Sequence, residues 1–540
     1  MSGFLLRFPS PWPSPRGAGR GDWEIVGEAR VDARDDLVRA LDAESSATDL
    51  ELILAAWRRW GESCVEHFIG DFSFAISDGA RLFCARDRFG VRPLYYARHD
   101  GALIVTNTLP ALLDIVPHDL DRDAVEELIV HGLTVSVART TFARIARVPP
   151  AHRLIAEGDR VRVERYWSFP IRDAPLDIGE RDAVEQFRDH LTNAVKDRAR
   201  GRVVVSMSGG IDSTSIAATL ARSGASVRAL TAVWDELIPD EERRFSEAAA
   251  RALGIPIEFQ VCDRYQPFER WWEPRVRGAE PVHEPFSAAF QDYMTMAAGR
   301  GSVLMGGWGG DPMLATSQSY FYDLLRRGRW PWFAWEALRY AVTRRRLPPL
   351  LLRSRLLRAA GLHKNRDTPP AWLLPPLRER WNAPPPVTDA RVHPFRPQAF
   401  RAVMSAAWPA VFQSYHSGAT GQPVECAAPF FDTRLLEFAF SLPPMPHFAG
   451  KDVLRQAMRG WLPNEVRLRP KTPLRGDPLA VLWPRVQQEW IATVERSGAL
   501  DAWIDRRILL DELRAGMTPN VRQHAHAIAL ARWLEYEHEP

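Results

Sequence analysis

The stretch SMSGGIDST, residues 206–214, directly follows the apolar run Val-Val-Val at 203–205. A short β-branched run, then hydroxyls and paired glycines, then a helix-forming run at 211–222 predicts a strand, a loop and a helix. Backbone N–H groups and hydroxyls at the start of a helix bind anions, and phosphate is the natural one. Gly209 and Gly210 lack Cβ atoms, so a phosphate could approach the main chain there.

We expect this loop to hold the phosphates of a nucleotide. The candidate phosphate-binding residues are Ser206, Ser208, Gly209, Gly210 and Ser213. The carboxylate of Asp212 would repel a bare phosphate, but it suits a Mg²⁺ ion lying between the two. The alternative is an ordinary Gly-Gly turn before a polar helix start. Neither GxxxxGKS nor GxxxxGKT occurs in the chain, which argues against γ-phosphate hydrolysis of the P-loop kind.

A second glycine-rich stretch, VLMGGWGGDPML at 303–314, ends a predicted strand and carries Asp311 into the loop that follows. Asp311 could hold Mg²⁺ together with Asp212. Gly307 is a further candidate contact for the nucleotide. The alternative for this stretch is a glycine-rich turn after a buried strand.

Composition bounds the class of protein. The chain has 540 residues, 46% of them apolar and 25% charged, which is typical of a globular protein with more than one domain. A net charge of +3 does not favour general nucleic-acid binding. The four cysteines lack metal-ligand spacing and fit a reducing compartment. No apolar run is long enough for a membrane span, and the N-terminus does not read as a signal peptide, so we expect a cytoplasmic protein.

Changes in composition and in the pattern of apolar residues along the chain predict two α/β domains, at 1–172 and 178–540. The first shows alternating strands and turns, including a hairpin at Asp78-Gly79 and a helix capped by Thr48. The second alternates strands and helices, which implies a parallel sheet. Between about 317 and 400 it becomes rich in Pro, Arg and Trp, and we interpret this part as a helical insertion.

Several ordered motifs, taken together, resemble the class B asparagine synthetase family. They are the Ser-Gly-Gly-x-Asp-Ser loop, the stretches PFFDTRLLEFAFSLPP, KDVLRQAMRGWLP and RLRPKTPL, and, in the first domain, GDFSFAISD and LFCARDRFGVRPLYY. The resemblance implies an N-terminal Ntn-hydrolase-like αββα sandwich, which is the family's glutaminase domain. It also implies a C-terminal ATP-pyrophosphatase (PP-loop) domain with a doubly wound parallel sheet. Such domains use ATP and Mg²⁺, cut ATP between its α- and β-phosphates and form adenylates.

The same resemblance suggests catalytic residues. Lys471, in RPKTPL, matches the family's active-site lysine and would stabilise the tetrahedral intermediate and the adenylate phosphate. Glu425, in PVECAAPFFD, is a candidate general base, with a structural carboxylate as the equal alternative. Only four of the 70 basic residues are lysines, so each one that remains is a candidate for a specific charge. For Lys451 we expect a local ion pair at a helix start, and for Asp240 and Glu241 an N-terminal capping role.

Two departures from the family pattern bear on function. Ser2 stands where the glutaminase has its nucleophilic Cys, and Val26-Gly27-Glu28 stands where it has Asn-Gly-Glu. Without that chemistry the attacking amine must come from the substrate. This form resembles the lasso-peptide cyclase branch, which joins the N-terminal amine of a precursor peptide to an Asp or Glu side chain. That branch implies a precursor peptide, a leader-peptide protease and a leader-recognition protein as partners. The alternatives are a β-lactam synthetase-like or asparagine synthetase-like ligase on a small molecule, and a nonenzymatic scaffold.

Overall fold

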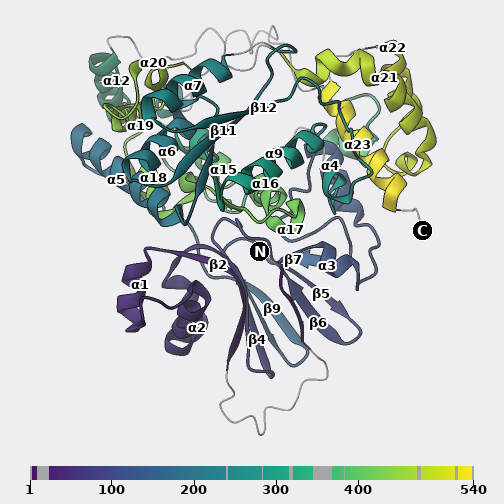
Figure 1. The fold of residues 1–540 in the computed structure, drawn as a ribbon, viewed down its shortest axis with the longest axis horizontal. Coiled ribbons are helices and arrows are strands. Elements are labelled where there is room, and N and C mark those ends of the chain that lie inside the picture. Colours follow the sequence, from purple (N-terminus) through teal and green to yellow (C-terminus); the bar gives the residue numbers. More distant parts are fainter. Residues whose placement is uncertain are drawn as a thin grey trace.

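The computed structural model describes residues 3–8, 23–238, 241–281, 284–315, 320–326, 328–344, 368–381, 383–470, 476–516 and 521–537. These residues form two bodies of helices and strands, one above the other in Figure 1. The first runs to residue 165 and the second from residue 180; we call them the first and second domains. Within the described ranges, no helix is long and apolar enough to cross a bilayer.

The first domain contains two antiparallel sheets. One has the strand order β2-β3-β4-β8-β9, formed by β2 (Glu24–Asp32), β3 (Ile69–Ser77), β4 (Arg81–Arg86), β8 (His152–Glu157) and β9 (Arg160–Arg165). The other has the order β1-β6-β5-β7, formed by β1 (Leu5–Phe8), β6 (Ala102–Thr106), β5 (Tyr95–His99) and β7 (Ile145–Arg147). The predicted hairpin joins β3 and β4 and turns at Gly79, where φ is +84°.

The two sheets pack on each other and each carries helices on its outer face, which gives the expected αββα sandwich. The layer between the sheets is built from Ala75, Leu82, Leu103, Val105 and Leu154. Helices α1 (Arg34–Leu41) and α2 (Asp49–Trp60) cover the first sheet, and α3 (Pro110–Leu113) and α4 (Arg122–His131) cover the second. As predicted, Thr48 caps α2; its side chain and that of Glu51 form a reciprocal capping box.

The second domain is built on a parallel sheet, as the alternation of strands and helices predicted. Its strand order is β12-β11-β10-β13-β14, formed by β12 (Ile257–Val261), β11 (Val227–Val233), β10 (Val203–Ser206), β13 (Val303–Gly306) and β14 (Glu425–Ala427). Both faces of the sheet are buried: Val203 and Val205 face one apolar cluster and Val204 faces another. This doubly covered arrangement explains why the central strand is an unbroken valine run.

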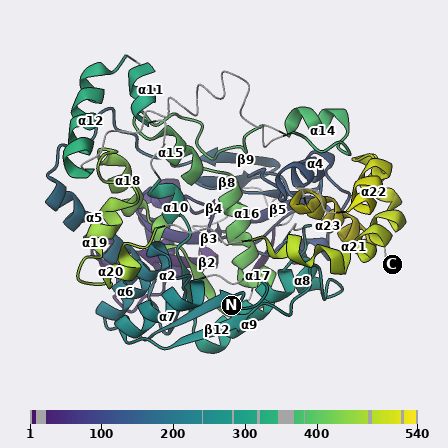
Figure 2. The same ribbon diagram turned by 90° about the horizontal axis from the view of Figure 1, so that it is seen from above.

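Helices lie on both faces of this sheet (Figure 2). One face is covered by α5 (Glu180–Arg198), α6 (Ile211–Arg222), α7 (Glu242–Leu253), α18 (Thr433–Ser441) and α19 (Asp452–Ala457), and the other by α9 (Ser287–Arg300). The remaining helices of the domain include α8 (Pro274–Arg277), α10 (Gly310–Met313), α16 (Ala407–Tyr415), α17 (Ser417–Thr420) and α20 (Asn464–Arg467).

The last helices extend the fold over the first domain. α21 (Pro478–Arg496), α22 (Arg506–Ala515) and α23 (Val521–Glu537) share one apolar cluster with α4 and with β5 and β6. In Figure 1 they lie beside α4, on the right. The hydrophobic core is therefore continuous from one domain to the other.

The Pro, Arg and Trp-rich part contains the expected helices, although its described residues 368–374 and 383–396 are not helical. It contains α11 (Tyr320–Arg326), α12 (Trp330–Arg344), α14 (Pro375–Arg380) and α15 (Pro397–Val403). Residues 316–319, 327, 345–367 and 382 lie outside the described residues. Glu336 on α12 is fully buried, beside a small cluster that includes Tyr320 and Met445. Burial raises the pKa of Glu336 to about 7, although the Arg339 charge acts in the opposite direction.

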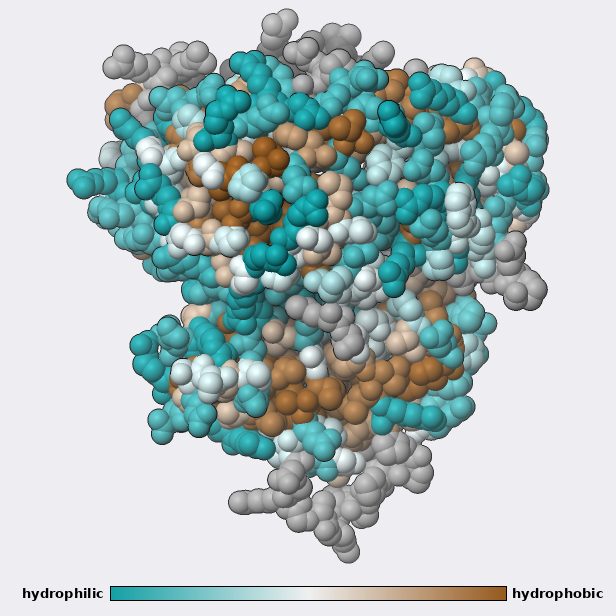
Figure 3. Space-filling model, in the orientation of Figure 1, coloured by the Kyte–Doolittle hydropathy of each residue, from teal (hydrophilic) through white to brown (hydrophobic). Residues whose placement is uncertain are grey.

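The surface reflects the same two-body plan. Figure 3 shows the domains joined at a narrower waist, with hydrophobic side chains gathered over the strands of the first domain on the face in view. One of the exposed apolar residues of that domain is Leu5 on the edge strand β1, at 46%. The interlayer core of the sandwich thus comes close to the surface where edge strands have no neighbour on one side.

Candidate active site

The predicted phosphate loop lies between β10 and α6, at the carboxyl edge of the parallel sheet. The backbone N–H of Ser208 donates to Oγ of Ser213 at 3.1 Å, and the two serine Oγ atoms are 3.3 Å apart. Ser206 is the last residue of β10. The hydroxyls predicted to hold phosphate are therefore gathered where β10 ends and α6 begins.

The two glycines of the loop have different roles. Gly209 has φ of +66°, and a Cβ there would lie 2.8 Å from Cβ of Phe245 and 2.9 Å from the N atom of Ser246, both on α7. It is therefore required by the turn and by the packing of α7, whatever binds in the loop. Gly210 has φ of −78°, and a Cβ there would meet only Oγ of Ser208, at 3.4 Å. Gly210 is the position at which the main chain stays open to an approaching phosphate.

The two candidate metal ligands meet at this edge. Gly307 and Gly310 pack against Asp212, and Cβ atoms on them would come within 3.0 and 2.7 Å of its side chain. Asp212 and Asp311 also share one cation: Nζ of Lys451 lies 2.5 Å from Oδ1 of Asp311 and contacts Oδ2 of Asp212. The fold thus brings together carboxylates from the first turns of two helices, α6 and α10, that are far apart in the sequence.

Lys451 corrects one expectation and adds a residue to the site. It is the N-cap residue of α19, but its ammonium reaches two distant carboxylates, so the expected local ion pair is wrong. Its backbone is left-handed, with φ of +63°, directly after Gly450 at +62°. This is an uncommon conformation for a side chain larger than Asn, and it directs the lysine to the centre of the site. The scarcity of lysine was the only sequence signal that pointed to it.

The donor set fits a magnesium ion. Two carboxylates that already hold an ammonium between them can hold a divalent cation there, and Mg²⁺ typically takes one or two carboxylates plus phosphate oxygens. Within the described residues, no group of three or more His, Cys, Asp or Glu side chains could form a metal cage of its own. A metal at this position would therefore take its remaining ligands from water or from the phosphates of the nucleotide.

The segment that carries the candidate lysine, RLRPKTPL, approaches the same loop. Lys471 itself lies outside the described residues, so its role stays a prediction. Arg469, two positions earlier, is almost fully buried and stacks on the Phe245 ring at 4.1 Å. One of its guanidinium nitrogens would lie 3.1 Å from a Cβ on Gly209, and the other bonds Glu242 at 3.3 Å. Sequence reasoning missed Arg469, which supplies positive charge directly behind the loop.

Glu425 lies away from this cluster. It pairs with Val303 at the amino end of β13, whereas the loops described above follow the carboxyl ends of the strands. It is buried and bonds Nη1 of Arg30 at 3.1 Å, and it also contacts Arg92. Because both arginines belong to the first domain, this placement favours a structural carboxylate over a general base.

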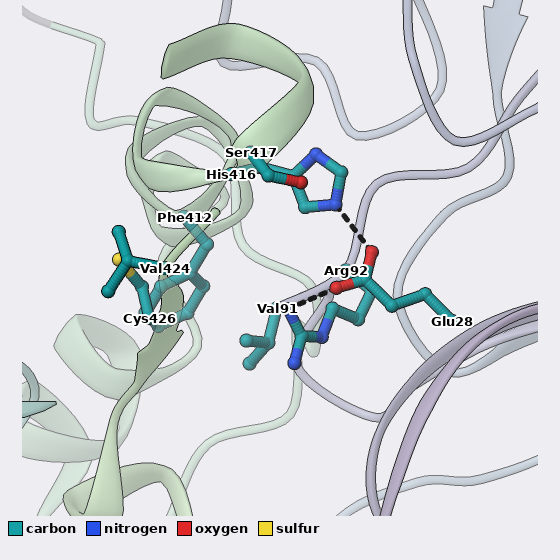
Figure 4. A pocket seen from close by; sticks show the side chains of 8 residues that line it. All are labelled: Glu28, Val91, Arg92, Phe412, His416, Ser417, Val424 and Cys426. Carbon is teal, nitrogen blue, oxygen red and sulfur yellow. Dashed lines mark hydrogen bonds and ion pairs between the residues drawn. The ribbon is translucent and has the colours of Figure 1, made fainter. Parts of the chain in front are cut away.

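Glu28 is the last residue of Val26-Gly27-Glu28, the stretch that departs from the glutaminase pattern. It belongs to the same cluster of charged side chains between the two domains (Figure 4). Its two carboxylate oxygens bond Nη1 of Arg92 and Nε2 of His416, each at 2.7 Å. Burial alone would raise the pKa of Glu28, but the Arg92 charge and the His416 hydrogen bond outweigh it and lower the pKa to about 2. The cavity beside them is about 10 Å³, room for roughly one water molecule.

Four further residues are placed as follows. Ser2 and Asp240 lie outside the described residues. Glu241 is the N-cap residue of α7, as expected, but its side chain makes no capping hydrogen bond and pairs with Arg244 at 3.2 Å. Tyr415 lies at the end of α16 and contacts the Trp308 ring.

Two family models match the chain. The asparagine synthase model matches residues 186–535, and the glutamine amidotransferase domain model matches residues 31–167. The second match begins after Ser2 and Val26-Gly27-Glu28, so it does not include the positions that depart from the glutaminase pattern.

Curated relatives are similar over part of their length. The chain is 27% identical over 320 residues to amidase chyE of Penicillium rubens, covering 55% of this chain and 47% of that protein. It is 30% identical over 214 residues to glutamine-hydrolyzing asparagine synthetase 3 of Bacillus subtilis, covering 37% and 34%. It is 29% identical over 238 residues to amidase chry2 of Gibberella zeae, covering 40% and 35%. The chain thus spans between about a third and about half of the length of these relatives.

Proposed function

We propose that this chain, which belongs to the asparagine synthase family, is an ATP-dependent carbon–nitrogen ligase that closes a peptide ring. It would adenylate an Asp or Glu side chain of a precursor peptide and join it to the peptide's own N-terminal amine, as in the lasso-peptide cyclase branch. The products are a macrolactam, AMP and pyrophosphate. The observation that carries the proposal is the meeting of Asp212, Asp311 and Lys451 beside a glycine loop at a helix start.

A carboxylate is a poor electrophile, so its oxygen first attacks the α-phosphorus of ATP. The bond from that phosphorus to the bridging oxygen breaks, and pyrophosphate leaves. Magnesium, held by Asp212 and Asp311, would supply positive charge to this leaving group. The loop N–H groups and the hydroxyls of Ser208 and Ser213 would hydrogen-bond phosphate oxygens. Lys451, a compact charge on a rotatable stem, would then exchange its carboxylate partners for phosphate.

The amine next attacks the carbonyl carbon of the acyl-adenylate. The carbon–oxygen bond to AMP breaks, a carbon–nitrogen bond forms, and the amine loses a proton. An α-amine has a pKa near ~8, so part of it is already neutral at pH 7. Glu425 is held by two arginines at the amino end of β14, whereas the predicted phosphate loop lies at the carboxyl ends of the strands. The step is therefore proposed without it. Lys471 stays the predicted cation for the tetrahedral intermediate.

The state of the first domain supports an amine that comes from the substrate. Where the family's glutaminase has Asn-Gly-Glu, this chain has Val26-Gly27-Glu28, and Glu28 is taken up by Arg92 and His416. A carboxylate paired on both oxygens at the domain interface is suited to joining the domains. We therefore propose that the first domain is a scaffold.

A second candidate function is amide formation on a small molecule. It is favoured by the relatives named asparagine synthetase and amidase, because those names describe single amide bonds and no peptide ring. Both functions predict the same adenylation and differ only in the second step. We further propose a cytoplasmic location and, for the cyclase, a leader-peptide protease and a leader-recognition protein as partners.

The test uses the full chain with ATP, MgCl₂ and synthetic peptides that have a free N-terminus and a single Glu at successive positions. The Glu side chain carries ¹⁸O in both carboxylate oxygens. Mass spectrometry should find a product lighter by one water, and one ¹⁸O should appear in AMP. Asp212→Asn should lower pyrophosphate release by at least about a hundredfold, because a bare amide is a poor Mg²⁺ ligand.

Three outcomes would contradict the cyclase. Asparagine formed from aspartate and ammonium, with every peptide left linear, would favour the small-molecule ligase. Formation of ADP in place of AMP would exclude both ligases. A folded chain that neither binds ATP nor consumes it would leave the scaffold function.

A further inference from the structure

The loop between β13 and α10 carries one side chain among four glycines. Its sequence at 306–311 is Gly-Gly-Trp-Gly-Gly-Asp, so Trp308 is the only group larger than hydrogen before Asp311. A Cβ on Gly306 would lie 2.7 Å from three carbon atoms of the Trp308 ring. Gly306 ends β13 and pairs with Ser206, which ends β10. The indole therefore lies over the carboxyl ends of the two central strands, beside the phosphate loop.

The neighbouring glycines let this loop close tightly. A Cβ on Gly309, where φ is +87°, would lie 2.6 Å from the Phe431 ring, and those on Gly307 and Gly310 would press on Asp212. A larger residue at any of these positions would therefore displace the loop. The indole is thus the one group that this loop can offer to a substrate.

The ring is held from behind. Its centroid lies 4.7 Å from that of Tyr415 at an interplanar angle of 60°, and Tyr415 in turn lies 4.9 Å from Phe290 at 89°. Trp308 nevertheless remains partly exposed. A backed but partly exposed ring presents a fixed apolar surface to whatever enters the site.

An indole offers one N–H donor and no basic atom, so it cannot take a proton from the attacking amine. What it can do is fill space, contact hydrocarbon and exclude water. An acyl-adenylate beside the phosphate loop needs that exclusion, because water is present at far higher concentration than any amine.

We propose that Trp308 decides which nucleophile reaches the acyl-adenylate, by packing against the hydrocarbon part of the acyl donor and excluding water. This inference rests on the proposed function. In the competing reaction a water oxygen bonds to the carbonyl carbon, the carbon–oxygen bond to AMP breaks, and a proton is released to solvent. The products are the free carboxylate and AMP. In the productive reaction the same bond breaks and the amine nitrogen takes the place of water.

The experiment compares Trp308→Ala and Trp308→Phe with the parent chain, using ATP, MgCl₂ and the same set of peptides. Two quantities are measured: cyclic product formed per AMP, and ATP–pyrophosphate exchange. For Trp308→Ala we expect exchange within about threefold of the parent, but product per AMP at least about tenfold lower, because water reaches the adenylate. Trp308→Phe should restore most of the ratio. Trp272→Ala, at a tryptophan that is 64% exposed, is the control and should change neither quantity.

Other results would overturn the inference. If Trp308→Ala forms as much cyclic product per AMP as the parent chain does, the ring does not exclude water. A folded Trp308→Ala variant that loses exchange would make Trp308 part of the nucleotide site. If Trp308→Phe forms no more cyclic product per AMP than Trp308→Ala does, an aromatic ring at this position does not account for the exclusion of water. If the parent chain forms no AMP with any peptide, the proposed function itself fails, and this role with it.

Discussion

Nζ of Lys451 lies 2.5 Å from Oδ1 of Asp311 and also contacts Asp212, which is 239 positions away in the sequence. A single ammonium therefore holds both carboxylates that are proposed to bind magnesium. An ammonium and a divalent cation cannot occupy one space between two carboxylates. The structure thus describes a competition, in which the lysine stands where the metal would be.

Lys451→Ala should separate two proposed roles of this lysine: competition with the metal ion for the carboxylates, and positive charge for the phosphates. Without the competing ammonium, Mn²⁺ in the absence of nucleotide should bind about tenfold more tightly, which electron paramagnetic resonance of free Mn²⁺ can measure. ATP–pyrophosphate exchange should nevertheless fall by about a hundredfold, because the phosphates lose a cation.

Lys196→Ala is the matched control, since this lysine is exposed on α5 and should leave both quantities unchanged. Lys451→Arg should not restore exchange, because a planar fork does not fit a compact, rotatable contact. Weaker Mn²⁺ binding in Lys451→Ala would refute the competition.

The two loop glycines form a natural pair of variants. Gly209→Ala places a Cβ against α7 in a left-handed backbone, which should cost about 1–2 kcal/mol for the conformation alone, and more for the clash. Gly210→Ala has φ of −78° and space, so the folded state should lose less than about 1 kcal/mol, while ATP binding should weaken. Thermal unfolding and calorimetric titration with ATP measure the two effects. Equal losses of stability would contradict the division of roles.

Glu28→Gln should destabilise the chain in a pH-dependent way. The pKa of Glu28 is lowered from its usual 4.5 to about 2, so the unfolded chain takes up this proton at a higher pH than the folded chain does. The stabilisation is therefore complete above about pH 4.5 and is lost as the pH falls toward 2; at pH 7 it is about 3 kcal/mol.

Thermal unfolding midpoints of Glu28→Gln and the parent should accordingly differ at pH 7 and converge below pH 4.5. Glu24→Gln, at an exposed position of the same strand, is the control and should differ from the parent at neither pH. A difference between Glu28→Gln and the parent that stays constant from pH 7 to pH 3.5 would exclude the ion-pair explanation.

For Glu336 we predict a pH dependence of stability that is opposite in sign to that of Glu28. Its pKa is raised by burial to about 7, so between about pH 4.5 and pH 7 the folded chain keeps a proton that the unfolded chain has lost. The folded state therefore loses stability as the pH rises through 7. Glu336→Gln, which stays neutral, should protect α12 better than the parent above pH 7, by up to about 3 kcal/mol, and equally at pH 4. Amide hydrogen exchange of α12 measures this, and equal protection at pH 8 would count against it.

Local structure was largely predictable from the sequence, because it depends on neighbours along the chain. The strand at 203–206, the helix that begins at Ile211 and the capping box of Thr48 follow from β-branching, glycine placement and side-chain spacing. The parallel sheet followed from the order of these elements. The position of the loop that is predicted to bind phosphate, between β10 and α6, followed for the same reason.

The contacts of charged side chains could not be predicted in this way. Lys451 was expected to pair locally, and nothing in its own helix shows that Asp212 and Asp311 come within reach. Glu425 lies next to a family motif, but its partners Arg30 and Arg92 belong to another domain. Such contacts depend on how distant loops and domains meet, which spacing along the chain does not encode.

The ion pairs between Glu425 and the first domain have a consequence for the history of the gene. Glu425 lies on β14, an edge strand of the parallel sheet in the second domain. Its counter-ions, Arg30 and Arg92, belong to the first domain. A truncated descendant that kept only the second domain would expose this carboxylate together with the apolar surface around it. Selection can therefore retain the first half as a permanent structural subunit long after any enzymatic duty of its own has lapsed.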